Sequence, residues 1–330
     1  MNERQQLMEM VVGHVPARAL QVAAMLGLAD QVLDGTDTAE GLAAAAGIDR
    51  WRMQRFMRVL IALGIFTRSG KTYHLTERGR YLAASDPDNI AAWTRMQGYF
   101  YLAYQELQAV LKTGQPGYEI ATGRRHFDAM ADMPDFATSF DLGMNQMMVP
   151  ETLAMIEKFD FGRFSHLMDV GGGNGYVLIH ALESNPQLEG VLFDLPDVVE
   201  RAGMRIAESP ANDRCTAIGG SFFEPLPKAL DAILLRHIIH DWTEEEALVI
   251  LGHCRDALPS GGTLLIAEAL IEDSDHLTVP IRLDLSMMTF YNGAERTLEE
   301  YRDLLEKAGL RIEHVTEISP ALAIMEARVA

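Results

Sequence analysis

A carboxylate and three glycines stand close together near the middle of the chain. Asp169 ends an apolar run, and Gly171, Gly173 and Gly175 follow it at alternate positions. A strand, a tight turn and a helix beginning at Tyr176 would bring backbone N–H groups close to a small ligand. A dinucleotide loop of the G-x-G-x-x-G type needs a third glycine where this chain has Tyr176, and the carboxylate suits a cation better than a pyrophosphate. The loop therefore predicts a site for S-adenosylmethionine, which carries an ammonium and a sulfonium.

Asp194 is the second acid of this predicted donor site. It stands nineteen residues after Gly175, at the end of the next predicted strand. An acid in that place can accept two hydrogen bonds from a ribose diol, in NAD sites as well as in methyl-donor sites. With Leu195 beside it, Asp194 indicates a nucleoside-containing donor, and the shape of the glycine loop favours S-adenosylmethionine.

A histidine-rich segment follows the fourth predicted strand. Arg236, His237, His240, Asp241 and Trp242 run off its C-terminal end, where ligands bind in parallel sheets. A phenol with a pKa of about 10 is only about one-thousandth ionised at neutral pH. A histidine with a pKa of about 6.5 can take that proton as the oxygen attacks a sulfonium methyl. A carboxylate on the other imidazole nitrogen would fix the tautomer.

The same histidines admit a metal-binding alternative. His237, His240 and Asp241 are ligand types, but their spacing runs across a strand end and no further ligand motif accompanies them. No metal is therefore predicted. His237 is expected to be a packed structural residue, because alternation along a strand need not aim it with His240.

Strands and helices alternate after position 165, as in a parallel sheet covered on both faces. After a helix over 297–309, two runs too close in sequence for a crossover predict an antiparallel edge hairpin. The pattern therefore predicts an α/β fold of the Rossmann-like, class I methyltransferase type, a doubly wound parallel sheet that ends in an antiparallel hairpin. The predicted strands are 167–170, 191–194, 216–219, 232–236 and 263–267, followed by the hairpin strands 310–318 and 322–329.

The first 88 residues predict a mainly helical, winged-helix domain. The expected helices are 17–28, 41–46 (with Asp37 and Glu40 as a capping box) and 49–63, and the expected strands are 65–68 and 72–75. Arg50, Arg52, Arg55 and Arg58 on the third helix allow a DNA-reading or a solvated, dimer-facing interpretation.

A helical region over 89–160 joins this domain to the donor-binding domain, predicted over 161–330. It is expected to be broken near 114–117 and at Pro134. Phe136, Phe140, Met144 and Met148 recur every four residues, which suits either plain core or the wall of a pocket for a flat substrate.

Composition narrows the class of protein. The chain has 330 residues, 48% of them hydrophobic, and a formal charge of −19, which opposes binding to nucleic acid or anionic membranes. Two cysteines make neither a disulfide framework nor a zinc pattern. The start resembles no signal peptide, and no apolar run reaches membrane length. A cytoplasmic location is expected.

Nearly the whole chain resembles the small-molecule O-methyltransferases typified by plant caffeic acid enzymes and bacterial polyketide and phenazine methyltransferases. The resemblance is carried by the segments 169–175 (Asp-Val-Gly-Gly-Gly-Asn-Gly), 240–242 (His-Asp-Trp) and 293–297 (Gly-Ala-Glu-Arg-Thr). It implies a homodimer through the N-terminal domain, with His240 as general base and Glu268 and Glu295 as its flanking acids. It also implies that Arg236 and Asp241 contact the donor, and that Trp242 lies by the adenine.

One position departs from the family pattern. The usual Gly-Asp-Phe-Phe after the third strand, whose acid meets the adenine amino group, is here Gly220-Ser221-Phe222-Phe223. Ser221 can still accept a hydrogen bond but carries no charge, and Phe222 can still pack on the adenine.

We therefore predict a metal-independent O-methyltransferase that uses S-adenosylmethionine to methylate an aromatic hydroxyl. N-methylation, a non-methylating hydroxylase or decarboxylase on the same fold, and a ligand-sensing DNA-binding regulator remain alternatives. The predicted pocket wall comprises Phe127, Phe136, Phe140, Met144, Met287, Met288 and Tyr291.

Overall fold

The computed structural model describes residues 2–125 and 132–330. Within these ranges the chain forms two compact units. The first comprises 2–106, 118–125 and 132–149, and the second comprises 107–117 and 150–330. None of the helices in the described ranges is both long and apolar enough to cross a membrane.

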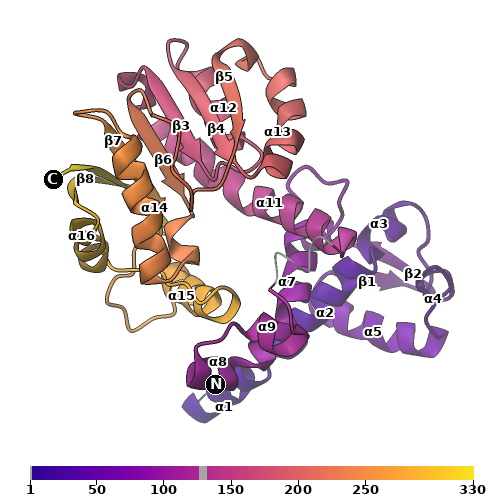
Figure 1. Ribbon diagram of the computed structural model, residues 1–330. Coiled ribbons are helices and arrows are strands. Elements are labelled where there is room, and N and C mark those ends of the chain that lie inside the picture. Colours follow the sequence, from indigo (N-terminus) through magenta and orange to yellow (C-terminus); the bar gives the residue numbers. More distant parts are fainter. Residues whose placement is uncertain (1, 126–131) are drawn as a thin grey trace. The chain divides into compact units, whose positions relative to one another are not determined.

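The first unit is mainly helical and contains one small hairpin (Figure 1). Its elements are α1 (Glu3–Val11), α2 (His14–Met25), α3 (Leu28–Leu33), α4 (Ala39–Ala46), α5 (Arg50–Ala62), β1 (Phe66–Ser69), β2 (Thr72–Leu75), α6 (Glu77–Arg80), α7 (Ala91–Gln105), α9 (Gly117–Thr122) and the first part of α11 (Pro134–Lys158). Leu28, Leu42, Met53, Met57 and Leu60 are among its fully buried side chains.

The predicted helices and hairpin of this unit are present, with local differences. The helix expected to close near Leu28 ends at Met25, because Gly27 turns left-handed and a separate short helix, α3, begins after it. The expected capping box at Asp37 is wrong: Thr38 is the N-cap of α4, and its side chain accepts from Gly41 N. Pro134 begins α11, as a proline without an N–H can at a first helical position.

The second unit is an α/β layer structure. Its elements are α8 (Leu107–Thr113), the end of α11, η1 (Phe161–Arg163), β3 (His166–Val170), α12 (Tyr176–Ser184), β4 (Glu189–Asp194), α13 (Pro196–Glu208), η2 (Asn212–Arg214), β5 (Cys215–Gly219), β6 (Ala232–Arg236), η3 (Ile239–Asp241), α14 (Glu244–Ala257), β7 (Thr263–Glu268), α15 (Val279–Phe290), α16 (Leu298–Lys307), β8 (Leu310–Ser319) and β9 (Leu322–Val329).

Its seven-stranded sheet has the order β5-β4-β3-β6-β7-β9-β8. The first five strands in that order are parallel, and β9 runs antiparallel to both β7 and β8. The predicted sheet with its C-terminal hairpin is therefore confirmed. The carboxyl ends of β3, β4, β6 and β7 meet at one edge, which gathers the residues that follow them.

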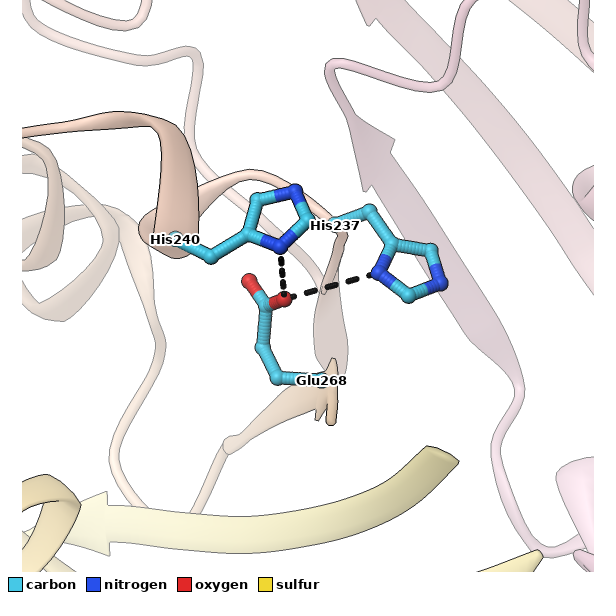
Figure 2. A group of neighbouring side chains, drawn as sticks. All are labelled: His237, His240 and Glu268. Carbon is cyan, nitrogen blue, oxygen red and sulfur yellow. Dashed lines mark ion pairs between the residues drawn. The ribbon is translucent and has the colours of Figure 1, made fainter. Parts of the chain in front are cut away.

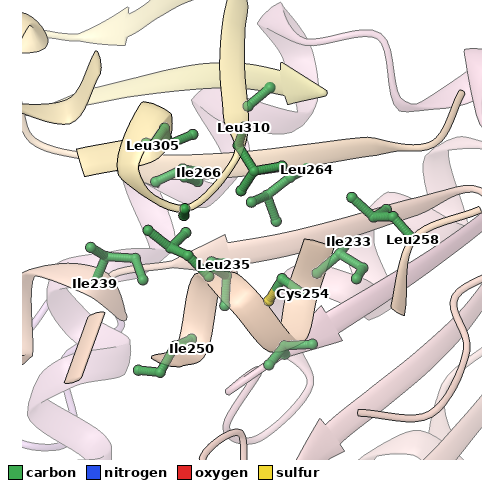
Figure 3. Close-up of a cluster of buried hydrophobic side chains, with 14 of the residues drawn as sticks. Ile233, Leu235, Ile239, Ile250, Cys254, Leu258, Leu264, Ile266, Leu305 and Leu310 are labelled. Atoms are coloured by element: carbon green, nitrogen blue, oxygen red, sulfur yellow. The ribbon is translucent and has the colours of Figure 1, made fainter. Parts of the chain in front are cut away.

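Alternation along the strands divides the core into two layers. Ile233, Leu235, Leu264 and Ile266 face α14 and α16, as Figure 3 shows for part of this cluster. Leu167, Leu234 and Leu265 belong to the opposite cluster, with α12, α13 and the end of α11. Burial of both faces fixes the register of the central strands, since a shift by one residue would exchange the two layers. The strand ends that carry the candidate site are thereby fixed.

Candidate active site

The glycine loop between β3 and α12 is a tight backbone turn. Gly171, Gly173 and Gly175 all have positive φ, at 72°, 59° and 75°, a region that side chains rarely adopt. A Cβ on Gly171 would lie 2.4 Å from Cδ1 of Ile238. A Cβ on Gly172 would lie 2.6 Å from Oδ2 of Asp169. Two glycines thus bring the loop against the buried carboxylate and the turn that carries His240.

Asp169 lies beneath this loop and is 2% exposed. Its Oδ2 has no hydrogen-bond partner in the part of the chain that the structure describes. Burial raises the pKa of Asp169 to about 7, although the positive charge of Arg236 acts in the opposite direction. A buried carboxyl oxygen without a hydrogen bond fits the ammonium or sulfonium of a cationic donor.

Asp194 at the end of β4 is joined to the same loop. Its Oδ2 accepts a hydrogen bond from Gly173 N at 2.8 Å, and its Oδ1 accepts one from Leu195 N at 2.7 Å. Burial raises the pKa of Asp194, and these two hydrogen bonds lower it. Since a carboxylate has about four acceptor positions, it can still receive a ribose diol. The structure therefore brings Asp169, the glycines, Asp194 and Leu195 together.

Phe222 and Trp242 form an aromatic pair next to the loop. Phe222, which follows β5, is 5.7 Å from the ring of Trp242, and the two rings are nearly perpendicular. A Cβ on Gly171 would also lie 3.6 Å from Cε1 of Phe222, so the ring borders the loop. Ser221 uses its hydroxyl to accept from Phe223 N at 3.2 Å. An apolar surface for a flat base is thus present, without the charge of the family's usual acid.

The histidine-bearing segment leaves β6 through a left-handed residue. His237 has a φ of 52°, and its N–H donates to the carbonyl of Ala267 in β7. The chain then enters η3, a 3-10 helix of one turn that contains His240. This reversal ends the strand alternation, so the rings of His237 and His240 lie 5.2 Å apart and tilted by 30°. The side chain of His237 is 10% exposed, as a packed residue would be, but its ring lies beside that of His240 and is not aimed away from it.

His240 is 7% exposed and is oriented by Glu295. Its Nδ1 lies 2.7 Å from Oε1 of Glu295, and its Nε2 lies 3.5 Å from Oδ1 of Asp241. Burial alone would lower the pKa of His240, but the carboxylates of Glu268, Asp241 and Glu295 outweigh it and raise the pKa to about 10. A proton on Nδ1 is hydrogen-bonded to Glu295, so Nε2 is the nitrogen that can take a proton from a bound molecule.

Glu268, the last residue of β7, holds the turn by its backbone. Its Oε1 accepts from Ile238 N at 3.0 Å and from Ile239 N at 2.9 Å. Its Oε2 faces two imidazoles, 3.5 Å from Nδ1 of His240 and 3.6 Å from Nδ1 of His237 (Figure 2). The two acids thus differ: Glu295 hydrogen-bonds the imidazole of His240, whereas Glu268 accepts from the backbone of the turn and faces both imidazoles.

His237, His240 and Glu268 also offer ligand atoms that lie within 4.8 Å of one another. Glu268 is thus a third ligand-type residue that the sequence spacing does not reveal. Glu295 already takes Nδ1 of His240 at 2.7 Å, in the direction that a metal on that nitrogen would need. The group therefore reads as a set of ion pairs centred on Glu268.

The segment after α15 packs against the backbone of His240. Gly293 approaches so closely that a Cβ there would lie 2.0 Å from the carbonyl oxygen of His240. Ala294 N donates to that same oxygen, and Glu295 N donates to Asp284 Oδ1 at 3.1 Å. The phenol of Tyr291 has a pKa well above its usual value, because of burial and then the charge of Asp241. The closing segment thus places the carboxylate of Glu295 against His240.

The predicted pocket residues fall into three groups. Phe136 is fully buried, stacked on Tyr99 at 4.7 Å, and belongs to the core of the first unit. Phe140 and Met144 in that unit are half-buried, as are Met288 and Tyr291 in the second, where Met287 is buried. Phe127 lies outside the described residues.

Sequence reasoning misses Glu151 and Asp284, and it also misses what Gly293 approaches, although Gly293 stands in the family segment 293–297. Glu151 of α11 lies 3.6 Å from Nη2 of Arg236 and 3.5 Å from Nε2 of His237. No pattern in its helix distinguishes it from other acids on that element. Gly293 follows an asparagine, which is a turn signal but says nothing of what the turn approaches. Asp284 becomes meaningful only through its contact with Glu295 N.

Comparison with known proteins supplies the family. An O-methyltransferase domain matches residues 104–311, and an O-methyltransferase dimerisation domain matches residues 8–85. The chain belongs to the O-methyltransferase family. The resemblance that the motifs carry is therefore confirmed, and the chain is an enzyme of the methyltransferase class.

Several relatives share nearly the whole chain. A phenazine O-methyltransferase of Lysobacter antibioticus is 32% identical, over 98% of this chain and 95% of its own. Aclacinomycin 10-hydroxylase of Streptomyces purpurascens is 35% identical, over 90% of this chain and 82% of its own. A solved O-methyltransferase from neocarzinostatin biosynthesis, in complex with S-adenosylmethionine and 2-hydroxy-5-methyl naphthoic acid, is 32% identical. Its TM-score is 0.87, covering 95% of this chain and 96% of that one.

Proposed function

We propose that this protein transfers a methyl group from S-adenosylmethionine to a hydroxyl of an aromatic small molecule. The main support for this proposal is the 2.7 Å contact between Nδ1 of His240 and Oε1 of Glu295. It fixes the tautomer in which Nε2 can accept a proton. The relatives that act on naphthoate and phenazine support an aromatic acceptor.

The donor is held by the loop region. Asp169, whose buried Oδ2 has no hydrogen bond among the described residues, is the counter-charge for the donor's cationic groups. Gly171 and Gly173, which have no side chain, let the donor approach the backbone closely. Asp194, with Leu195 beside it, receives the ribose, and Phe222 and Trp242 pack against the adenine near Ser221. Arg236 and Asp241 complete this proposed donor set. The donor supplies an electrophilic methyl on a sulfonium.

His240 holds and moves the proton of the reaction. Its Nε2 accepts the hydroxyl proton, and Glu295 and Glu268 stabilise the imidazolium that results. The pKa of His240, about 10, is close to that of an ordinary phenol, so transfer of the proton from a phenol to His240 is nearly neutral in free energy. In the free enzyme at neutral pH this histidine is protonated. A cationic donor and an apolar acceptor placed beside it favour its neutral, accepting form.

The acceptor wall and the assembly are proposed as follows. Met288 and Tyr291, which flank the end of α15 in the second unit, contribute apolar and aromatic surface for a flat substrate, and no metal is required. The protein forms a homodimer through residues 8–85. Helix α1 supports this proposal, because it has no buried residue and exposes Leu7, Met8, Met10, Val11 and, just beyond it, Val12.

The test is transfer of labelled methyl from S-adenosylmethionine to a mixed panel of phenols, hydroxyquinones and phenazines. Wild type should give a labelled product with a mass gain of one methylene. The His240→Ala variant should give far less. His180→Ala is the matched control, since His180 lies on α12, where it pairs with Glu183 and contacts the ring of Tyr176. Equal product from wild type and His240→Ala would refute the base assignment.

A second function is favoured by one relative, the aclacinomycin 10-hydroxylase. A hydroxylase on this fold would add one oxygen to the product instead of one methylene. Product mass in the same assay separates the two chemistries, and the attachment of the label to nitrogen or oxygen separates N- from O-methylation. His240 with its two acids supports O-methylation, because a hydroxyl needs its proton removed.

A further inference from the structure

His237 occupies a position that the proposed mechanism does not use. It is a non-glycine residue with a φ of 52°, and it stands between β6 and the turn that carries His240. Left-handed backbone at a residue with a side chain is uncommon and collects at functional sites. The backbone of His237 therefore suggests a functional role, which depends on the contacts of its side chain.

The side chain of His237 lies between two carboxylates. Its Nδ1 faces Oε2 of Glu268 at 3.6 Å, as drawn in Figure 2, and its Nε2 faces Oε2 of Glu151 at 3.5 Å. The imidazole is only 10% exposed. An imidazole carries N–H donors on both nitrogens only when it is protonated. Acids on both sides of a buried ring therefore favour the cation.

The charged groups around His237 come from four elements. Glu151 lies on α11, Glu268 on β7, Arg236 on β6 and His240 on η3. Burial alone would lower the pKa of His237, but the two carboxylates outweigh burial, Arg236 and His240, and the pKa is raised. His237 and His240 thus compete for one oxygen, Oε2 of Glu268.

We propose that His237 is a positioning residue that neutralises Glu268, so that His240 can release its proton at a lower pH. This inference rests on the proposed base role of His240. Without a second cation, Glu268 would direct its whole negative charge at His240 and stabilise the imidazolium. With His237 charged between Glu151 and Glu268, that pull is divided, and the backbone of the turn keeps its place.

The direct test follows the ring protonation of His240 in the full chain by NMR, for wild type and His237→Asn. Asparagine tolerates left-handed backbone but carries no charge. The apparent pKa of His240 should rise by roughly one pH unit in the variant, a tenfold change in proton affinity. An unchanged or lowered value in a folded variant would overturn the proposal.

Glu151→Gln provides an independent variant on a different element. Because it weakens the cation of His237 without touching His240, it should move the titration of His240 in the same direction by a smaller amount. A shift in the opposite direction would contradict the proposal. Glu157→Gln on the same helix is the matched control and should leave the titration unchanged; a similar shift there would also contradict it.

Kinetics distinguish this inference from failure of the proposed function. With an acceptor from the labelled-methyl panel, the acidic limb of kcat/KM in His237→Asn should move to higher pH, and its high-pH rate should approach that of wild type. A uniform loss at every pH would mark a merely structural residue. If His240→Ala retains full activity, the base role of His240 fails, whatever His237 does; if wild type methylates no acceptor at all, the proposed function fails.

Discussion

The loop of residues 169–175, here the proposed donor loop, and the turn of residues 237–241, here the proposed base turn, lie at the same end of one sheet but are built in different ways. The loop is one continuous segment, residues 169–175, and its shape comes from glycines with positive φ. The base turn depends on four distant segments, which supply Glu151, His240, Glu268 and Glu295. A local backbone motif can be read from spacing, whereas an assembled charge cluster exists only after the chain has folded.

Changes to the two regions should therefore separate donor binding from turnover. The largest effect is expected for Glu295→Gln. The variant loses the carboxylate that fixes the tautomer of His240, and turnover should fall by on the order of 10³-fold. Donor affinity measured by calorimetry should stay the same. Glu317→Gln, an exposed acid on β8, is the control. A parallel loss of donor affinity would show that the two regions are not separable.

A smaller loss of turnover is expected for Gly293→Ala. The added Cβ would meet backbone atoms of His240 and Asp241 at 2.0–2.9 Å, so the turn must move. A displacement of about 1 Å at a catalytic group can cost about 10²-fold in rate. Gly252→Ala on α14 is the control, since nothing lies within 4 Å of its added Cβ. Normal turnover in Gly293→Ala would show that the closing segment does not place the base.

The smallest effect, on donor affinity alone, is expected for Asp169→Asn. Loss of a charge-assisted contact should weaken binding of S-adenosylmethionine by about tenfold near pH 8. Because burial raises the pKa of Asp169 to about 7, the wild-type carboxyl is neutral below that pH and charged above it. Wild-type donor affinity should thus increase as pH rises through 7.

Asp169→Asn should lose that pH dependence. Calorimetry across pH 6–8.5 provides the measurement, and Asp213→Asn, an exposed acid in η2, is the control. A variant that keeps the wild-type pH dependence would remove Asp169 from the donor site.

The contrast between the two regions also explains what the sequence could predict. Strands β3 to β9 lie within about two residues of their expected ends, because buried apolar runs and turn signals are local properties. Thr243 and Thr297 form capping boxes at the starts of α14 and α16, and the Thr-x-x-Glu spacing of each is visible in the sequence. The sequence favours Asp37 over the actual cap, Thr38, because these adjacent residues both have capping side chains and differ only in the backbone they adopt.

The base turn was less accessible to such reasoning. Glu268 and Glu295 could be chosen among many acids only through the family resemblance, because their distance from His240 depends on the sheet and the closing segment. Glu151 and the left-handed His237 could not be chosen at all. Side-chain direction after a strand end depends on backbone dihedrals that tertiary contacts impose.

The roles of His240 as base and Asp194 as donor ligand are tested by comparing His240→Ala with Asp194→Ala in one series of assays. Donor affinity is measured by calorimetry, and turnover is measured at saturating donor with an acceptor from the panel. His240→Ala should retain donor affinity and lose about 10²–10⁴-fold in turnover, the usual contribution of a positioned base. Asp194→Ala should bind the donor weakly and recover turnover once the donor saturates. Undiminished turnover in His240→Ala would contradict the central claim that this histidine takes the acceptor's proton.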